Sequence, residues 1–254
     1  MRFGLNIGAD AEQVKAAAKA GFDYVETGFS VLAGNNETLD AFCAALAENH
    51  IACEAVNCFI PGRLKVTGNT VDREALKEYI ERGMSNAEKA GTKIVVFGSG
   101  GARNVPDGFS YGEAVRQLIG FLGTVVSPIA KKYGITVTIE PLCDSNIITT
   151  VREGAMLTAA VGTEEVKLLC DLFHMYRVGD TLDSLSGLDG MLRHSHIAEP
   201  ENRGYPLSAD EYDYAGFVRA VEALGCPRCT IEATNADIRK DAGTAAKVLK
   251  SLNR

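Results

Sequence analysis

The sequence predicts a (β/α)₈ barrel that occupies residues 1–254 as a single domain. Its length of 254 residues matches the roughly 250 residues that such a barrel typically needs. Short apolar, β-branched runs alternate with longer helical patterns along the whole chain, without a linker or a change in composition. Gly21, Gly91, Gly134 and Gly162 each follow a predicted helix, where αβ turns need a C-cap residue that tolerates a left-handed backbone.

Each predicted strand is a short apolar run, and each predicted helix shows apolar residues at helical spacing. The strands are expected at 2–7, 22–26, 51–57, 93–97, 135–140, 166–171, 194–198 and 229–233. The helices are expected at 11–20, 38–49, 72–90, 111–133, 150–161, 212–224 and 239–252. Between the sixth and seventh strands the chain is short and glycine-rich, so we expect only a stubby helix there. No G-x-G-x-x-G motif follows the first strand, which argues against a dinucleotide-binding fold.

The composition argues against nucleic acid and membrane as partners. The formal net charge is −7 and no basic stripe is present, whereas phosphate binding needs clustered Lys and Arg. The first ten residues carry one basic side chain and no long apolar run, so neither a signal peptide nor a membrane anchor is expected. Seven scattered cysteines are typical of reduced thiols, and we expect a cytoplasmic protein.

Polar residues lie at or near the ends of four consecutive predicted strands, where barrel enzymes carry their chemistry. They are Glu140, Asp171, His196 and Glu232. In a closed barrel these ends converge, and three carboxylates directed at one centre repel one another unless a cation neutralises them. Such an oxygen-rich set suits Mn²⁺, Mg²⁺ or Co²⁺, and Zn²⁺ also binds it. We therefore predict a divalent metal here; the alternative is a set of salt bridges to Arg and Lys at the barrel mouth.

Two histidines compete for the metal in the seventh strand. His194 and His196 are two residues apart, so their side chains lie on the same face. If that face is inward, His196 lies nearer the barrel mouth and is the favoured ligand, with His194 one layer deeper. If the face is outward, neither histidine binds metal.

Two further residues follow the predicted ligands in what we expect to be loops. His174, in D-L-F-H, is either a donor to the site or a solvent-exposed loop histidine. Arg203, after the seventh strand, would be a suitable electrophile beside a developing oxyanion.

Several stretches of the chain carry a family resemblance. They are N-C-F-I-P-G (57–62), V-V-F-G-S-G-G-A-R-N-V-P-D-G-F (95–109), T-I-E-P-L (138–142), N-I-I-T-T-V-R-E-G (146–154), C-D-L-F-H-M (170–175), H-S-H-I-A-E-P-E-N-R-G-Y-P (194–206) and T-I-E-A (230–233). Together they resemble the xylose-isomerase-like TIM-barrel sugar isomerases and epimerases, which include ketose 3-epimerases, hydroxypyruvate isomerases and inosose-processing enzymes. The resemblance covers most of the chain but does not fix the substrate.

The resemblance implies that Glu140, Asp171, His196 and Glu232 bind a divalent metal, with Mn²⁺ favoured, and that Glu140 and Glu232 are also the acid/base groups. His174 and Arg203 are implied to bind substrate, and we place Asn57 and Asp144 with them. Asp144 stands nearest to a Glu that relatives carry in a longer loop. Relatives often line the pocket with tryptophan, which this chain lacks, so we expect Phe29, Phe59 and Phe109 to line it instead.

This set of residues permits proton transfer beside a carbonyl group. A metal that holds the carbonyl and a neighbouring hydroxyl stabilises an enediolate, and a carboxylate near the carbon removes the proton. Epimerisation needs a base on each face of the substrate, and Glu140 and Glu232 come from the fifth and eighth strands. An aldose–ketose isomerisation needs only one base. We therefore expect a metal-dependent isomerase or epimerase of a small polyhydroxy carbonyl compound, with 3-epimerisation of a ketose favoured.

Three other functions remain open from the sequence. Two share the chemistry: isomerisation of a hydroxypyruvate-type substrate, and dehydration or isomerisation of an inosose. The third is a metal-dependent abasic-site endonuclease, which is disfavoured because that scaffold uses several more histidines than the four of this acidic chain. A homo-oligomer is also possible, since relatives often pair through helices at the barrel edge.

Overall fold

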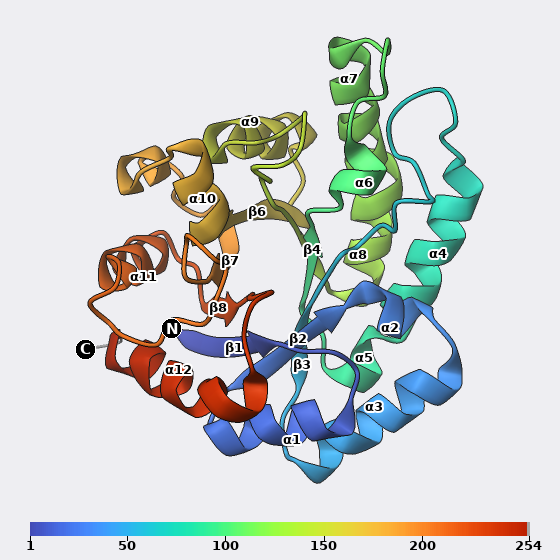
Figure 1. Ribbon diagram of the computed structural model, residues 1–254. Coiled ribbons are helices and arrows are strands. Elements are labelled where there is room, and N and C mark those ends of the chain that lie inside the picture. The colour runs from blue at the N-terminus through green and yellow to red at the C-terminus, as the bar shows by residue number, and fades with distance from the viewer. Residues whose placement is uncertain (253–254) are drawn as a thin grey trace.

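The short apolar runs of the sequence form the parallel strands of a closed barrel in the computed structural model, which describes residues 1–252 (Figure 1). Each strand pairs with the next, and the eighth returns to the first. The strands are β1 (Arg2–Asn6), β2 (Tyr24–Gly28), β3 (Cys53–Asn57), β4 (Ile94–Phe97), β5 (Thr136–Ile139), β6 (Val166–Asp171), β7 (Leu192–Ile197) and β8 (Arg228–Ile231). The predicted fold class is therefore confirmed.

The helices surround the barrel as an outer ring (Figure 1). The longer ones are α1 (Ala11–Ala20), α3 (Asn36–Glu48), α4 (Arg73–Ser85), α7 (Tyr111–Phe121), α8 (Ser127–Tyr133), α9 (Val151–Val161), α11 (Tyr214–Ala223) and α12 (Ile238–Leu252). Short helices are α2 (Phe29–Ala33), α5 (Ala87–Ala90), α6 (Gly100–Arg103) and α10 (Leu172–Val178). The expected stubby helix is a 3₁₀ turn at Leu182–Leu185.

Glycine ends the helices where the sequence predicted it. Gly21, Gly91, Gly134 and Gly162 all adopt positive φ, between 62° and 89°, at the C-caps of α1, α5, α8 and α9. A left-handed residue there lets the chain turn back toward the next strand.

Two long predicted helices are interrupted. The helix expected at 72–90 breaks at Asn86, whose side-chain amide donates to the carbonyls of Leu32 and Arg82 instead of lying in solvent. The helix expected at 111–133 contains a π-helical turn at Leu122–Val126 between α7 and α8. Helices α2, α6 and α10 follow strand ends or their turns; α10 lies where a loop was expected, and no element was predicted for the other two.

The barrel interior changes from apolar to polar toward its carboxyl end. Its lower layers contain the buried cluster of Tyr24, Ala55, Ile94, Val96 and Leu169. Side chains alternate along each strand, so the residues two positions further on also face inward. Two positions beyond Tyr24, Ala55 and Leu169 lie Glu26, Asn57 and Asp171, which belong to the site described below.

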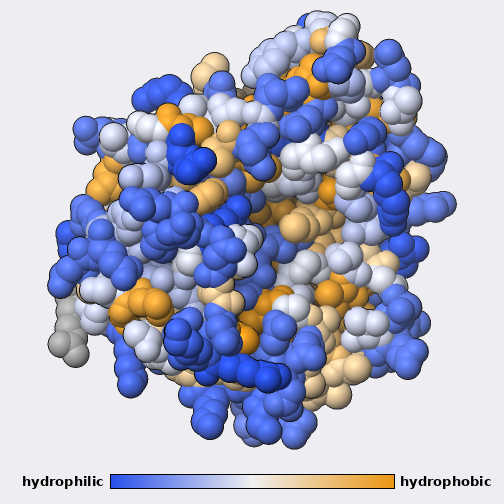
Figure 2. Space-filling view, viewed as in Figure 1, coloured by the Kyte–Doolittle hydropathy of each residue, from blue (hydrophilic) through white to orange (hydrophobic). Residues whose placement is uncertain are grey.

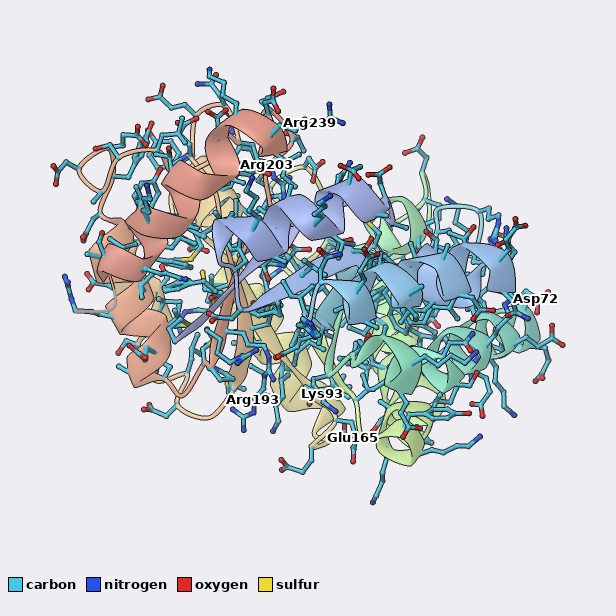
Figure 3. The ribbon with its side chains drawn as sticks, turned by 90° about the horizontal axis from the view of Figure 1, so that it is seen from below. Asp72, Lys93, Glu165, Arg193, Arg203 and Arg239 are labelled. Atoms are coloured by element: carbon cyan, nitrogen blue, oxygen red, sulfur yellow. The ribbon has the colours of Figure 1, made fainter. Side chains whose placement is uncertain are left out.

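The two ends of the barrel carry different residues. Figure 3 shows Arg203 at one end of the molecule, and Lys93, Glu165 and Arg193, which lie at strand starts, at the opposite end. Hydrophilic residues dominate the face drawn in Figure 2, where hydrophobic ones form small separate groups. Among residues 1–252, no helix is long and apolar enough to span a membrane.

Candidate metal and catalytic site

Four potential metal ligands meet at the carboxyl end of the barrel. Asp171 is the last residue of β6, His196 lies within β7, and Glu140 and Glu232 directly follow β5 and β8. One ligand atom from each of these residues lies within 4.8 Å of the others. The backbone N–H of Glu140 still donates to the carbonyl of Phe97 (3.2 Å), which continues the strand ladder and keeps the carboxylate inward.

The two ring nitrogens of His196 face different carboxylates, with Nε2 toward Glu26 and Nδ1 toward the other three ligands. Its Nδ1 faces the carboxylates, at 3.2 Å from Glu140 Oε1, 3.5 Å from Glu232 Oε2 and 4.0 Å from Asp171 Oδ2. His194 is also fully buried and lies one layer deeper. The alternative in which both histidines face outward is therefore wrong.

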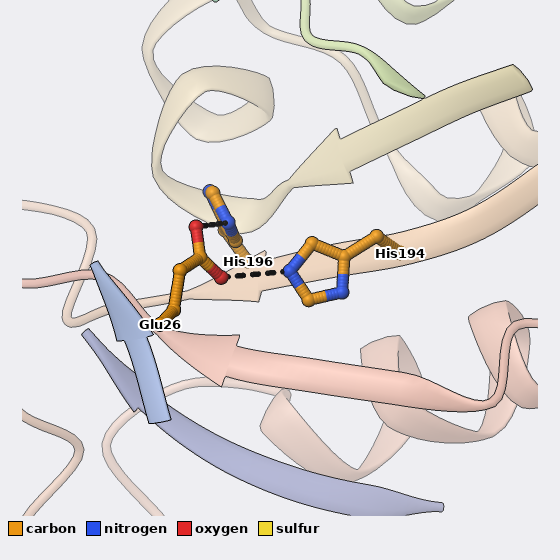
Figure 4. Close-up of side chains that lie close together, drawn as sticks. All are labelled: Glu26, His194 and His196. Carbon is orange, nitrogen blue, oxygen red and sulfur yellow. Dashed lines mark hydrogen bonds and ion pairs between the residues drawn. The ribbon is translucent and has the colours of Figure 1, made fainter. Parts of the chain in front are cut away.

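Glu26, at the third position of β2, is a buried residue of the site that the sequence analysis missed. Its Oε2 accepts from Nε2 of His194 (2.8 Å) and its Oε1 accepts from Nε2 of His196 (3.0 Å), as Figure 4 shows. A signal was present, since Glu26 ends the apolar run F-D-Y-V-E as Glu140 ends T-V-T-I-E.

Burial and mutual repulsion shift the pKa values of the carboxyl groups. Burial, reinforced by the charge of Glu232, raises the pKa of Glu140. Burial also raises the pKa of Asp171, although Arg203 and His196 partly offset it. For Glu232 burial acts in the same direction, but His196 and Arg203 outweigh it and lower its pKa to about 2. The cluster therefore needs positive charge to hold its carboxylates ionised.

Two positive groups supply part of that charge. Burial alone would lower the pKa of His196, but the carboxylates of Glu26 and Glu232 outweigh it and raise the pKa well above its ordinary value. Arg203 extends from the β7–α11 loop and pairs with Glu232 Oε2 and, at 3.3 Å, with Asp171 Oδ2. Its backbone has φ 54°, a left-handed conformation that is uncommon for a residue with a side chain.

Asn57, the last residue of β3, holds the other oxygen of Glu232. Its side-chain amide donates to Glu232 Oε1 at 2.6 Å, and the amide of Asn6, at the end of β1, lies 3.5 Å from the same atom. Asn57 thus contacts a proposed catalytic group directly. Asn6 was not expected in the site, although it lies one residue before the end of a predicted strand.

His174 lies in helix α10 and not in a loop, and only 4% of it is exposed, so the solvent-exposed alternative is wrong. Its Nδ1 accepts from the backbone N–H of Cys143 (3.2 Å), which leaves the proton on Nε2. Within residues 1–252 this buried Nε2 has no hydrogen-bond partner and lies 3.7 Å from Asp171 Oδ2 and 4.0 Å from Glu140 Oε1. It is a donor directed at the centre of the site.

A cavity of about 440 Å³ opens above these groups, and Asn57, Glu140, His174, Arg203 and Glu232 line it. A second hollow of about 470 Å³ adjoins it, and both are lined by Asp144, His174 and Arg203. This volume is in the range of small-molecule sites. All four residues expected to bind substrate therefore lie at the cavity.

The aromatic residues expected to line the cavity do not do so. Phe29 and Phe59 are fully buried and pack against each other, with ring centroids 4.9 Å apart. Phe109 packs against the hydrophobic core. Tyr79 and Phe173 are the rings that line the two hollows instead. The side chains of Phe29 and Phe59 fill the space between sheet and helices. The sequence does not distinguish an aromatic residue in that layer from one at the barrel mouth.

Comparison with known proteins places this geometry in a family. The family model described as xylose isomerase-like TIM barrel matches residues 14–252. The chain belongs to this family. A D-psicose 3-epimerase from Agrobacterium fabrum (strain C58 / ATCC 33970) is 28% identical over 206 residues, which cover 75% of this chain and 68% of that protein. The family resemblance inferred from the sequence is therefore confirmed.

Solved structures share the fold at lower identity. A D-allulose 3-epimerase from Methylomonas sp. aligns with a TM-score of 0.83 and 19% identity, over 99% of this chain and 98% of that chain. The IOLI protein, solved with a bound zinc atom, aligns with a TM-score of 0.70 and 19% identity, over 100% of this chain and 96% of that chain. The family match and the relationship to a psicose epimerase bear out the expectation of an isomerase enzyme.

Proposed function

We propose that this protein is a divalent-metal-dependent sugar epimerase that inverts C3 of a free ketose. The observation that carries the proposal is the convergence of Glu140, Asp171, His196 and Glu232 within 4.8 Å at the floor of a cavity. The relationship to a D-psicose 3-epimerase supports the ketose as substrate.

The residues present fit a divalent cation. Three carboxylates and the Nδ1 atom of His196 provide one donor atom each, which is the oxygen-rich set that Mn²⁺, Mg²⁺ or Co²⁺ prefers. The raised pKa values of Glu140 and Asp171 indicate that these carboxylates lack sufficient positive charge from the protein alone. A bound cation would polarise the substrate carbonyl and make the adjacent C–H bond more acidic. We propose Mn²⁺, with Mg²⁺, Co²⁺ and Zn²⁺ as alternatives.

Glu140 and Glu232 are the proposed acid/base pair. They enter the cavity from the ends of β5 and β8, so we expect each carboxylate to approach a different face of the bound substrate. The amide of Asn57 and the guanidinium of Arg203 hold the two oxygens of Glu232, which keeps this carboxylate ionised and oriented as a base. One glutamate removes the C3 proton, and the other, in its protonated form, donates its own proton to the opposite face, which inverts the carbon.

The remaining cavity residues position the substrate. The buried Nε2–H of His174 is directed at the centre of the site, where a substrate oxygen can accept its hydrogen bond. Arg203 lies beside it and can hold a second substrate oxygen. Asp144, on the wall shared by the two hollows, is placed to accept from a sugar hydroxyl.

The test is proton exchange in D₂O with a panel of ketoses, hydroxypyruvate and inososes, using the purified protein titrated with Mn²⁺. Epimerisation predicts that deuterium enters C3 of a ketose and that the C3 epimer forms. Deuterium in hydroxypyruvate, or loss of water from an inosose, would favour one of the two alternative reactions. Cleavage of abasic DNA without sugar exchange would favour the nuclease.

A matched pair of variants assigns the base. Glu232→Gln is expected to retain Mn²⁺ binding but to abolish exchange at C3, because the amide cannot accept the proton. Glu54→Gln is the control, since Glu54 pairs with Arg2 and Arg228 at the opposite end of the barrel. Exchange at the wild-type rate in Glu232→Gln would exclude Glu232 as the base.

A further inference from the structure

We infer that Glu26 is a positioning residue that fixes which nitrogen of His196 faces the metal centre. This inference rests on the proposed function for the identity of His196 as a ligand. It assigns a role to a side chain that does not line the cavity, and it explains why two histidines occupy β7.

The contacts of Glu26 are fully enclosed. The side chain is 0% exposed, and each of its oxygens faces one ring: Oε1 lies 3.0 Å from Nε2 of His196, and Oε2 lies 2.8 Å from Nε2 of His194 (Figure 4). Glu26 reaches these rings from β2, across the barrel interior from β7. Its position is therefore fixed by the barrel and not by a loop.

The chemistry of a carboxylate then selects the tautomer. An ionised carboxylate only accepts hydrogen bonds, so the Nε2 atoms of both rings must carry their protons. A neutral imidazole with its proton on Nε2 has its lone pair on Nδ1. His196 reaches this form when its Nδ1 proton is lost, and the Nδ1 lone pair then points at the oxygens of Glu140, Glu232 and Asp171. Glu26 thereby presents His196 as a metal ligand through Nδ1.

His194 supports Glu26 from below. Its Nε2 also lies 3.2 Å from the hydroxyl of Thr230, which is 2.9 Å from the hydroxyl of Tyr24 in the lower layer. Among the residues that the structure describes, Nδ1 of His194 has no partner. The ring therefore holds the second oxygen of Glu26 and is not directed at the cavity.

Glu26, His194 and His196 could instead hold a second metal ion, since one ligand atom of each lies within 4.8 Å of the others. That arrangement and the one we infer are mutually exclusive, because a nitrogen that binds a metal cannot donate a proton to Glu26. Metal stoichiometry separates them: the inference predicts one ion per chain.

The decisive variant is Glu26→Gln, measured by competition with a chelator for Zn²⁺ or Mn²⁺. Glutamine provides one acceptor and one donor group, so it cannot accept from both Nε2 atoms. Where His196 is the ring left without an acceptor, its proton moves to Nδ1, and that atom can no longer bind a metal. We expect affinity to fall about 10- to 100-fold, the usual effect of losing such a partner. Glu54→Gln, the same change at a carboxylate remote from the site, should leave affinity unchanged.

A second measurement uses the wild-type chain, so the inference stays testable if Glu26→Gln does not fold. The four histidines can be followed through their ¹⁵N ring resonances in the zinc-loaded protein. We expect a protonated Nε2 and a zinc-shifted Nδ1 for one ring, assigned to His196 by its loss in His196→Gln. Zinc on Nε2, two ions per chain, or unchanged affinity in Glu26→Gln would each overturn the inference. A chain that binds no divalent ion would overturn the proposed function itself.

Discussion

Nη2 of Arg203 lies 3.3 Å from Oδ2 of Asp171, and the same guanidinium nitrogen contacts Oε2 of Glu232. A side chain from the β7–α11 loop thus neutralises two of the carboxylates that we propose as metal ligands. In this arrangement Arg203 and a divalent cation would compete for the same carboxylate oxygens. Each of them favours the ionised form of the carboxyl groups.

Arg203→Gln is therefore expected to separate metal binding from catalysis. Loss of the competing charge should tighten Mn²⁺ binding by about tenfold, equivalent to about 1.4 kcal/mol. Loss of the substrate contact should reduce kcat/KM by about 100-fold or more. Chelator competition and steady-state kinetics measure the two effects. Arg177→Gln is the control, because Arg177 lines only the adjoining hollow, where it stacks over the ring of Phe173. Weaker metal binding in Arg203→Gln would contradict the competition.

Gly98 gives Glu140 the room that its carboxylate occupies. A Cβ at residue 98 would overlap Oε2 of Glu140, so the carboxylate would have to move. Gly98→Ala should therefore lower kcat/KM by about tenfold or more, since small displacements of catalytic groups are costly. Gly100→Ala is the matched control, because its Cβ would meet only Leu142 and Asn104 at 3.4 and 3.9 Å. Equal activity in the two variants would show that Glu140 adjusts without cost.

Arg103 joins the strand ends beneath the site. Its buried guanidinium donates to the carbonyls of Phe97 (3.1 Å), Glu140 (2.8 Å) and Ile148 (3.2 Å). Arg103→Met would leave these carbonyls without the donor, and we expect unfolding free energy to fall by about 3 kcal/mol or more. Urea denaturation measures this change. Arg116→Met, at an exposed pair with Glu113, should change stability by less than about 0.5 kcal/mol. Similar losses in both variants would exclude a special role for Arg103.

Glu153 makes stability depend on pH through the N-terminus of α9. Burial opposes ionisation of its carboxyl group, but hydrogen bonds from the backbone and hydroxyl of Thr149 and the backbone of Thr150 outweigh it and lower its pKa. A carboxyl group whose pKa is lowered by folding stabilises the protein at any pH above its ordinary pKa. This contribution is lost as the pH falls from the ordinary pKa through the lowered one. Glu153→Ala should therefore cost about 1 kcal/mol at pH 7 and less in acid. A cost that is equal at pH 7 and at pH 3 would contradict this account.

Much of the fold followed from the sequence because strand ends and helix stops are local signals. The β-branched runs and the glycines after α1, α5, α8 and α9 depend on neighbouring residues alone. The break at Asn86 depends on a carbonyl of Leu32, which is far away in the chain, so no local pattern indicates it. His174 was assigned to a loop because α10 is short and begins directly at the strand end, where Asp171 caps it.

The candidate site was predicted only where its residues share one strand-end pattern. Glu140, Asp171, His196 and Glu232 each end an apolar run, and the structure brings them together; their roles stay predictions. Glu26 has the same pattern, but its partners lie on the opposite side of the barrel and only the closed structure shows them. The expected aromatic lining was wrong because the sequence does not indicate whether a phenylalanine that follows a strand turns toward the cavity or toward the helices.

The chain of hydrogen bonds from Tyr24 through Thr230 and His194 to Glu26 occupies space that most barrels fill with aliphatic side chains. This places a limit on engineering the protein for heat resistance. Replacing these polar groups with well-packed apolar residues is a common route to greater stability, since buried polar networks contribute little net free energy. Here the same replacement would loosen Glu26 and with it the orientation of His196. Along this line of side chains, a substitution that raises thermal stability is thus expected to impair the orientation of the metal ligand.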